Sequence, residues 1–291
     1  MPLAFIRNLV EKTVLYLRMI KFSHSVFALP FALTSAFIAA GGLPRGRTLF
    51  WIVAAMVSAR TAAMGLNRII DREIDLENPR TAGRELPAGK IRVRETVLFV
   101  TMATAVFILS AYMLNPLCFR LSGVALFFLF FYSFTKRFTW ASHFVLGVTI
   151  SAAPVGAWIA VTGGFDPRIL LLGFSVVFWL AGFDILYAFQ DFEFDRKYGL
   201  YSIPAIFGIA KSLWISRACH FLTWLLLLLT GISFGMAFPF YIGVALAGLL
   251  LLYEHSLVRP DDLRKLNKAF FDMNGYISIT VFAFTAISYL H

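Results

Sequence analysis

The sequence predicts an all-α polytopic membrane protein with about nine transmembrane helices. Of its 291 residues, 59% are hydrophobic and 14% are charged, and the mean hydropathy of +0.78 lies well outside the range of soluble domains. The apolar residues form continuous runs of about 20, the length at which a helix crosses a bilayer. Because the runs do not alternate about every ten residues, they favour helices over a membrane barrel.

Nine apolar runs are long enough to span a membrane. The fourth and fifth are the least regular, because Arg120 and His143 interrupt them and the link at Asn115 and Pro116 is short. The runs lie near 22–41, 48–69, 95–114, 116–134, 141–162, 169–189, 212–232, 234–253 and 270–290.

The first 20 residues carry apolar side chains at helical spacing, with charged residues off that face. This pattern predicts an amphipathic helix in the interface of the inner leaflet. The charged lead is too long for a cleavable signal peptide. Since no linker interrupts the chain, we expect residues 1–291 to form one domain.

The formal net charge of +10 is unevenly distributed. Most Lys and Arg residues fall in alternate segments between the runs, whereas the other segments hold only Arg45, Arg47, Arg120 and Arg168. This positive-inside bias predicts a bacterial cytoplasmic (inner) membrane protein with its N-terminus in the cytoplasm and its C-terminus outside. Anionic membrane lipids are the expected partners of the excess charge, and nucleic acid is not.

Two pairs of aspartates follow apolar runs at matching places. Asp71 and Asp75 follow the second run, and Asp191 and Asp195 follow the sixth, which predicts two halves of similar construction. Residues four apart share one face of a helix, and Asn67 lies one turn before the first pair. Converging carboxylates need a cation, and all-oxygen ligands suit Mg²⁺. The alternative is that the acids only pair with neighbouring basic residues.

Two arginines, Arg80 and Arg84, follow the first pair in a loop that turns at Pro79 and Pro87. Planar guanidinium groups bind phosphate oxygens in pairs. Together with Mg²⁺ they would hold a diphosphate and stabilise it as a leaving group.

These segments resemble the motifs of the UbiA-type intramembrane prenyltransferases. NRIIDREIDLENPRTAGRELPAG, within residues 67–90, is similar to the first motif, NxxxDxxxD followed by RTxxRxLPxG. FDILYAFQDFEFDRKYGLYSIPAIFG, which contains residues 184–204, is similar to the second, and YSFTKRFT is similar to the Tyr-x-x-x-Lys-Arg after the fourth helix.

The resemblance implies nine transmembrane helices around a central cavity, with both aspartate motifs on its cytoplasmic side. It implies that a Mg²⁺-diphosphate is bound by Asn67, Asp71, Asp75, Asp191 and Asp195, and that Arg80, Arg84, Lys136 and Lys197 hold the phosphate oxygens. Tyr132 would lie beside the allylic cation, which its ring can stabilise.

The activity implied is transfer of a polyprenyl group from polyprenyl diphosphate to the ring of an aromatic acid. We expect 4-hydroxybenzoate as the acceptor, on a ubiquinone route, with Arg18, Lys21 and Arg137 as candidates to bind its carboxylate. The chain lacks the Arg-Pro-like pair that many hydroxybenzoate enzymes of the family place before the first helix, so a dihydroxynaphthoate acceptor on a menaquinone route is the alternative. A chlorophyll-type synthase also remains open, as do tail length and the choice between Mg²⁺ and Mn²⁺.

An ion-coupled transporter is the alternative from another class, because charges inside a membrane mark ion pathways. That function predicts charges near the middle of spans. Here the acidic residues cluster at the inner ends of the runs, which favours the enzyme.

Overall fold

The computed structural model describes residues 12–21, 28–258 and 273–290, and all regular elements in this part of the chain are helices. After a helix at 12–19, they are α2 (Leu29–Ala40), α3 (Gly46–Ile70), α4 (Arg72–Glu77), α5 (Val93–Leu114), α6 (Pro116–Thr135), α7 (Ser142–Thr162), α8 (Ile169–Ala188), the 3₁₀ helix η2 (Phe189–Asp191), α9 (Phe192–Tyr198), α10 (Ile203–Phe207), α11 (Ile209–Phe234), α12 (Phe238–Leu257) and α14 (Asn274–Ile287). The all-α prediction is confirmed.

Each of the nine predicted spans contains one apolar helix. Within the described ranges, seven helices are long and apolar enough to cross a membrane, and α2 and α14 are shorter apolar helices. The first predicted span also includes 22–27 and the last includes 270–272, which lie outside the described residues, as do 1–11 of the predicted interfacial lead and 259–269 of the third long connection.

The short link between α5 and α6 separates two full-length helices because Asn115 and Pro116 stop one and start the other. The Asn115 side chain accepts a hydrogen bond from the Cys118 backbone N–H at 2.9 Å, which caps α6. Pro116 occupies the first position of α6, where no N–H is needed. Asn115 also donates to the Ile159 carbonyl at 2.8 Å, which ties this corner to α7.

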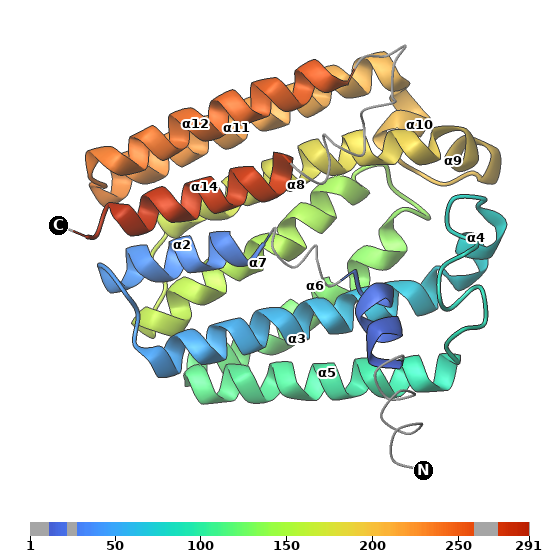
Figure 1. Ribbon diagram of the computed structural model, residues 1–291, viewed down its shortest axis with the longest axis horizontal. Helices are drawn as coiled ribbons and strands as arrows, with labels where there is room; N and C mark the ends of the chain where they lie inside the picture. The colour runs from blue at the N-terminus through green and yellow to red at the C-terminus, as the bar shows by residue number, and fades with distance from the viewer. Residues whose placement is uncertain (1–11, 22–27, 259–272, 291) are drawn as a thin grey trace.

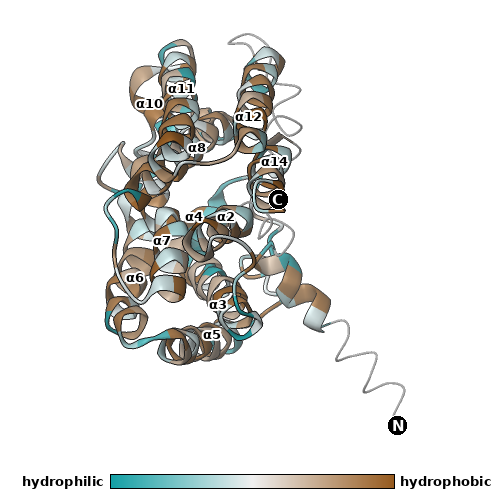
Figure 2. Ribbon diagram, turned by 90° about the vertical axis from the view of Figure 1, so that its left-hand side faces the viewer, coloured by the Kyte–Doolittle hydropathy of each residue, from teal (hydrophilic) through white to brown (hydrophobic). Residues whose placement is uncertain are grey.

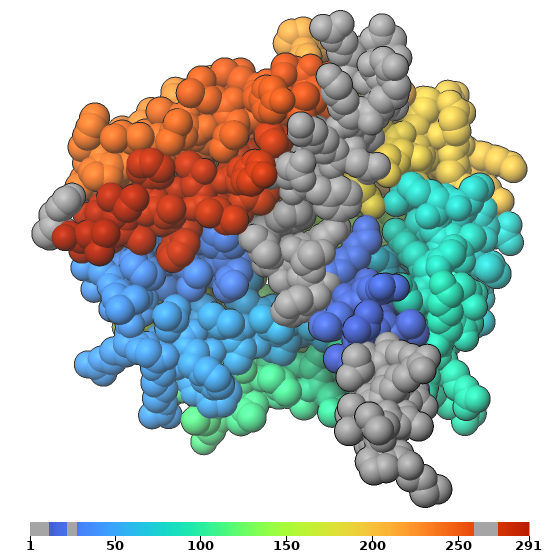
Figure 3. Space-filling view, in the orientation of Figure 1, coloured from blue at the N-terminus to red at the C-terminus, as the bar shows by residue number. Residues whose placement is uncertain are grey.

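The long helices lie side by side, and α4, α9 and α10 gather at one end of the bundle (Figure 1). We call this the motif end, because both aspartate motifs lie there. In the view along the bundle from the opposite end, α3, α5, α6 and α7 form one group, α8, α11, α12 and α14 form another, and α2 lies between them (Figure 2). The surface in Figure 3 shows α14 directly beside α2.

The central element of the bundle is α8. In its apolar stretch 72% of the residues are buried, against 22–39% in the other six long helices of the described chain. Its Trp179 is fully buried and packs on Phe31 of α2, with ring centroids 4.8 Å apart. The second aspartate motif is therefore carried by the most enclosed of the long helices.

The packing of α7 against α8 depends on one glycine. A Cβ atom on Gly147 would lie 2.5 Å from the Val177 carbonyl oxygen, which is closer than atoms can approach. Any larger residue would force the helices apart. This close approach lets the first turn of α7 reach the inner end of α8.

The long helices consist largely of hydrophobic residues, which are brown in Figure 2, and many of these residues are exposed on the outside of the bundle. Large exposed hydrophobic side chains include Leu98, Met102, Phe127, Leu249 and Leu252. An exposed apolar surface of this kind suits contact with lipid tails. Together with the spanning helices, it makes the chain an integral membrane protein.

Candidate active site

Each aspartate pair lies where a long helix gives way to a short one. Asp71 separates α3 from α4 with φ −91° and ψ 3°, and Asp191 separates η2 from α9 with φ −107° and ψ 6°. These angles fall in the sparsely populated bridge region between helix and strand, where many active-site residues lie. The face that a continuous helix would give is thus interrupted at the first aspartate of each pair.

Asp71 is buried, with 3% of its surface exposed, and has three side-chain partners. Lys136 donates to its carboxylate at 2.6 Å and Arg137 donates at 3.0 Å, both from the end of α6. Asn67 donates from α3 at 3.0 Å. The buried charge is therefore compensated by cations from another helix, as a carboxylate in an apolar bundle requires.

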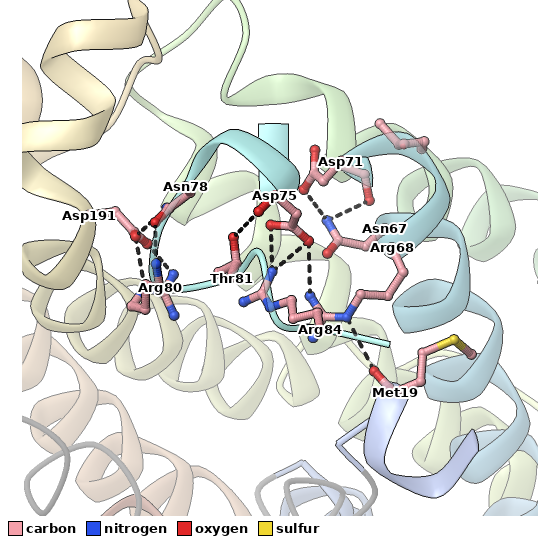
Figure 4. Close-up of polar contacts among 12 residues, drawn as sticks. Met19, Asn67, Arg68, Asp71, Asp75, Asn78, Arg80, Thr81, Arg84 and Asp191 are labelled. Atoms are coloured by element: carbon pink, nitrogen blue, oxygen red, sulfur yellow. Dashed lines mark hydrogen bonds and ion pairs between the residues drawn. The ribbon is translucent and has the colours of Figure 1, made fainter. Parts of the chain in front are cut away.

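Asp75 is equally buried and faces two arginines (Figure 4). Arg84 donates to both of its oxygens at 2.7 and 2.8 Å, and Arg68 lies 3.9 Å away. Arg68 also donates to the Met19 carbonyl at 3.2 Å, so it links the N-terminal helix to α3. The loop folds back onto α4 because Thr81 donates to the Asp75 carbonyl at 3.0 Å.

Asp191 joins the two motifs. Arg80 forms a two-pronged ion pair with its carboxylate, and the distance from Arg80 Nε is 2.8 Å. Asn78 donates to the same carboxylate at 2.8 Å (Figure 4). Arg80 also donates to the Tyr187 hydroxyl at 3.0 Å. The loop after the first aspartate pair thus contacts the second pair directly.

Asp195 faces the cavity one turn further along α9. Its carboxylate accepts a hydrogen bond at 2.9 Å from Ser202, and the Ser202 hydroxyl also caps α10 by accepting from the Ala205 N–H. No lysine or arginine within salt-bridge distance of Asp195 is seen in the described ranges, so it is the least compensated of the four.

A cavity of about 720 Å³ opens beneath the motifs and runs through the bundle. All four motif aspartates line it, with Asn67, Arg80, Arg84, Lys136 and Tyr132. Further from the motif end its walls are mostly apolar and reach Ile52 on α3 and Cys118 on α6. From Ile52 to Asp71 is 19 residues, or roughly 28 Å of helix. The cavity combines a charged mouth with a long apolar interior.

Carboxylate and amide oxygens at the cavity mouth are candidate ligands for a divalent cation. Among the described residues, no three His, Cys, Asp or Glu side chains converge as a ready-made metal site, and three of the motif aspartates pair with cations instead. Mg²⁺ is typically held by one or two carboxylates, with waters and substrate phosphates completing its shell. The all-oxygen donors lining the cavity mouth fit an ion that arrives with a diphosphate.

The remaining predicted residues divide into two groups. Lys21 lines the cavity and donates to the Tyr187 hydroxyl at 3.3 Å; burial lowers the pKa of Lys21, and the tyrosine partly offsets this effect. Arg18 and Lys197 are exposed and do not line the cavity. Arg137 does not line it either, but it contacts the lining residues Asp71 and Ser133.

The cavity residues that had no role in the sequence-based prediction include Arg60, Asn78 and Tyr187. Tyr187 lies four residues before Asp191, and Arg60 lies seven before Asn67, so helical spacing puts each on the same face as a motif residue. A charged residue inside a predicted span is itself an indication of function, and Arg60 is such a residue.

Comparison with known proteins agrees with this geometry. The model of the UbiA prenyltransferase family matches residues 28–277. The chain belongs to this family. The expectation of a prenyltransferase, based on its resemblance to UbiA-type enzymes, is thereby confirmed.

Two bacterial relatives in the family are named 4-hydroxybenzoate octaprenyltransferase. The one from Aeromonas hydrophila subsp. hydrophila is 33% identical over 259 residues, which are 89% of each protein. The one from Saccharophagus degradans is 31% identical over 250 residues, covering 86% of this chain and 83% of the relative.

Solved structures of UbiA homologues share the fold. The apo structure of the homologue from Aeropyrum pernix K1 superimposes with a TM-score of 0.83 at 29% identity, covering 91% of this chain and 97% of the other. The homologue from Archaeoglobus fulgidus, solved bound to DMAPP and Mg²⁺, gives a TM-score of 0.75 at 20% identity, covering 94% and 98%.

The pairing of Asp75 predicts a large stability loss on its neutralisation. We expect Asp75→Asn to lower the free energy of unfolding by about 3 kcal/mol, because Arg68 and Arg84 would remain as uncompensated charges. Thermal unfolding of the detergent-purified protein measures this. Glu73→Gln, at an exposed site on the same short helix, is the control and should leave the midpoint unchanged. Equal midpoints for the two variants would contradict the structural role of Asp75.

Proposed function

We propose that the protein transfers a polyprenyl group from polyprenyl diphosphate to the ring of an aromatic acid, with 4-hydroxybenzoate as the acceptor, in ubiquinone-type quinone biosynthesis. The observation that carries the proposal is the cavity, whose charged mouth continues into an apolar interior. The names of the bacterial relatives support the choice of acceptor. The positive-inside bias supports a cytoplasmic location for the motif end.

The diphosphate would bind at the motif end. Arg80, Arg84 and Lys136 line the cavity and already pair with carboxylates, so a diphosphate can take over these cations while the aspartates hold Mg²⁺. The bound Mg²⁺ supplies positive charge that stabilises the leaving diphosphate. The arginines contribute paired hydrogen bonds to its oxygens.

The reaction breaks the bond between the allylic carbon and the diphosphate oxygen. The ring carbon of the acceptor then supplies the electron pair of the new carbon–carbon bond, and the ring loses its proton to the departed diphosphate. Tyr132 lies one turn before Lys136 on α6 and lines the cavity, where its ring face can stabilise the allylic cation. The apolar walls exclude the water that would otherwise capture the cation.

The acceptor carboxylate would bind Arg60. This side chain reaches the cavity from the middle of α3, and its Nε atom is buried without a hydrogen-bond partner in the described structure. No acidic side chain of the described ranges forms an ion pair with it. A guanidinium on the wall of an apolar cavity, with its Nε–H unsatisfied, is stabilised by an anionic ligand that pairs with it. Lys21, at the cavity mouth, remains a second candidate for the same anion.

Turnover of defined acceptors tests the proposed activity. Membranes containing the protein are incubated with Mg²⁺, labelled polyprenyl diphosphate and either 4-hydroxybenzoate or a dihydroxynaphthoate, and the lipid products are extracted. We expect prenylated hydroxybenzoate. A naphthoate product alone would move the enzyme to a menaquinone route, and no product at several tail lengths would contradict the proposal.

Removal of one carboxylate from either motif should abolish turnover. Asp71→Asn and Asp191→Asn each take away a charged oxygen ligand, so we expect less than about 1% of wild-type activity and weaker binding of Mg²⁺-diphosphate. Asp166→Asn, in the loop before α8 at the opposite end, is the control. Full activity in well-folded motif variants would refute the metal assignment.

Substitution of Arg60 should affect the acceptor and spare the donor. Arg60→Met removes a charged hydrogen-bond donor, and we expect the Michaelis constant of the acceptor to rise about tenfold to a hundredfold. Binding of polyprenyl diphosphate should stay within about twofold of wild type, because Arg60 lies two helical turns from Asn67. Steady-state kinetics with each substrate varied in turn separates the two effects, and a loss of donor affinity alone would contradict this role.

A further inference from the structure

A second polar layer lies below the motif aspartates. Asp184 precedes Asp191 by seven residues, as Arg60 precedes Asn67. Seven residues are about two helical turns, so each lies on nearly the same face as its motif residue and roughly 10 Å deeper. Both side chains line the cavity. The cavity therefore holds the cation Arg60 and the anion Asp184 about two helical turns below the motif residues.

The carboxylate of Asp184 is held in place by His143. The Nδ1 atom of His143, in the first turn of α7, lies 2.7 Å from Asp184 Oδ2. The Nε2 atom lies 3.2 Å from the Ile203 backbone nitrogen, whose N–H must donate to it. An imidazole that accepts at Nε2 carries its proton at Nδ1, so His143 donates to Asp184. The tautomer and the direction of this hydrogen bond are fixed by α10.

The other oxygen of Asp184 remains available to a ligand. His143 is the one hydrogen-bond partner that the described structure gives Asp184, and 26% of the aspartate side chain is exposed, although His143 is buried. The surroundings include the apolar side chains of Leu146, Leu180 and Phe183. A carboxylate in such a wall needs a hydrogen-bond donor to replace the water it has lost.

Resting on the proposed function, we propose that Asp184 binds the ring hydroxyl group of the acceptor and that His143 is its positioning residue. The acceptor would then lie with its carboxylate at Arg60 and its hydroxyl at Asp184. A hydroxyl that donates a hydrogen bond to a carboxylate gains electron density on its oxygen. Resonance passes part of this density to the ring carbon ortho to the hydroxyl. That carbon supplies the electron pair for the new bond, so the contact both selects hydroxylated acids and activates them.

The alternative is a purely structural role, in which Asp184 and His143 only tie α7, α8 and the start of α10 together. If the role is structural, a substitution of Asp184 should weaken the binding of every ligand of the cavity alike. If Asp184 recognises the hydroxyl, the substitution should weaken the binding only of ligands that carry a hydroxyl. The acceptor analogue benzoate, which lacks the hydroxyl, therefore distinguishes the two roles.

The test compares two constants at saturating Mg²⁺ and polyprenyl diphosphate: the Michaelis constant of the hydroxylated acceptor and the inhibition constant of benzoate. In Asp184→Asn we expect the Michaelis constant to rise about tenfold or more, because a hydrogen bond to a charged group is lost. The inhibition constant of benzoate and the dissociation constant of polyprenyl diphosphate should each change less than about twofold. Equal losses for the hydroxylated acceptor and benzoate, or no change in either, would overturn the proposal.

Two substitutions of His143 provide a second, independent test in which Asp184 is unchanged. His143→Gln keeps one donor and one acceptor, so it should retain the wild-type preference for 4-hydroxybenzoate over benzoate. His143→Ala releases the carboxylate and should reduce that preference several-fold. Equal preferences in the two variants would overturn the positioning role.

The wild-type protein separates this proposal from the proposed function. If it prenylates only a dihydroxynaphthoate, the same comparison is made with 2-naphthoate as the analogue that lacks hydroxyl groups. If it binds polyprenyl diphosphate but prenylates neither acid, the proposed function fails and the role of Asp184 fails with it. Turnover by wild type with unchanged preference in Asp184→Asn overturns the role of Asp184 alone.

Discussion

Compensation of buried carboxylates by cations is the constraint on which the rest of the structure depends. An apolar bundle can hold Asp71 and Asp75 only because Lys136, Arg137 and Arg84 are brought against them from other segments. Several other features of the fold bring these pairs together. The helices break at Asp71 and Asp191, and the loop returns over α4. The N-terminal helix docks through Arg68. The apolar helices behind them are then free to enclose a cavity.

The spans and the four aspartates could be predicted because both depend on local pattern. Continuous apolar runs fix the helices, and spacing by four marks the acids that line the cavity, although the helix breaks at the first aspartate of each pair. The sequence predicted that Arg80 and Arg84 would hold a diphosphate, and nothing in their spacing showed that Arg80 would reach Asp191 and Arg84 would reach Asp75. Such partners are set by the path of a loop through space, which a linear pattern does not encode.

The deeper polar residues were harder to predict for a different reason. Arg60 and Asp184 are isolated charged residues within apolar runs. Their proposed role in binding becomes apparent only from the structure, in which both line the same cavity. His143 interrupts the fifth apolar run in the sequence, whereas the structure gives it two hydrogen bonds that require a single tautomer. The similarity of the two halves stays a prediction, although each motif has the same order of long helix, bridge-region aspartate and short helix.

The ion pair between Arg80 and Asp191 means that each motif supplies a counter-ion for the other. Loop and motif neutralise each other across the mouth of the cavity, and a metal-bound diphosphate would, under the proposed function, present the same two kinds of charge there. Under the proposed function, substrate entry would exchange one set of ionic partners for another. Before that exchange, the pairing leaves neither the Arg80 guanidinium nor the Asp191 carboxylate as a bare ion at the cavity mouth.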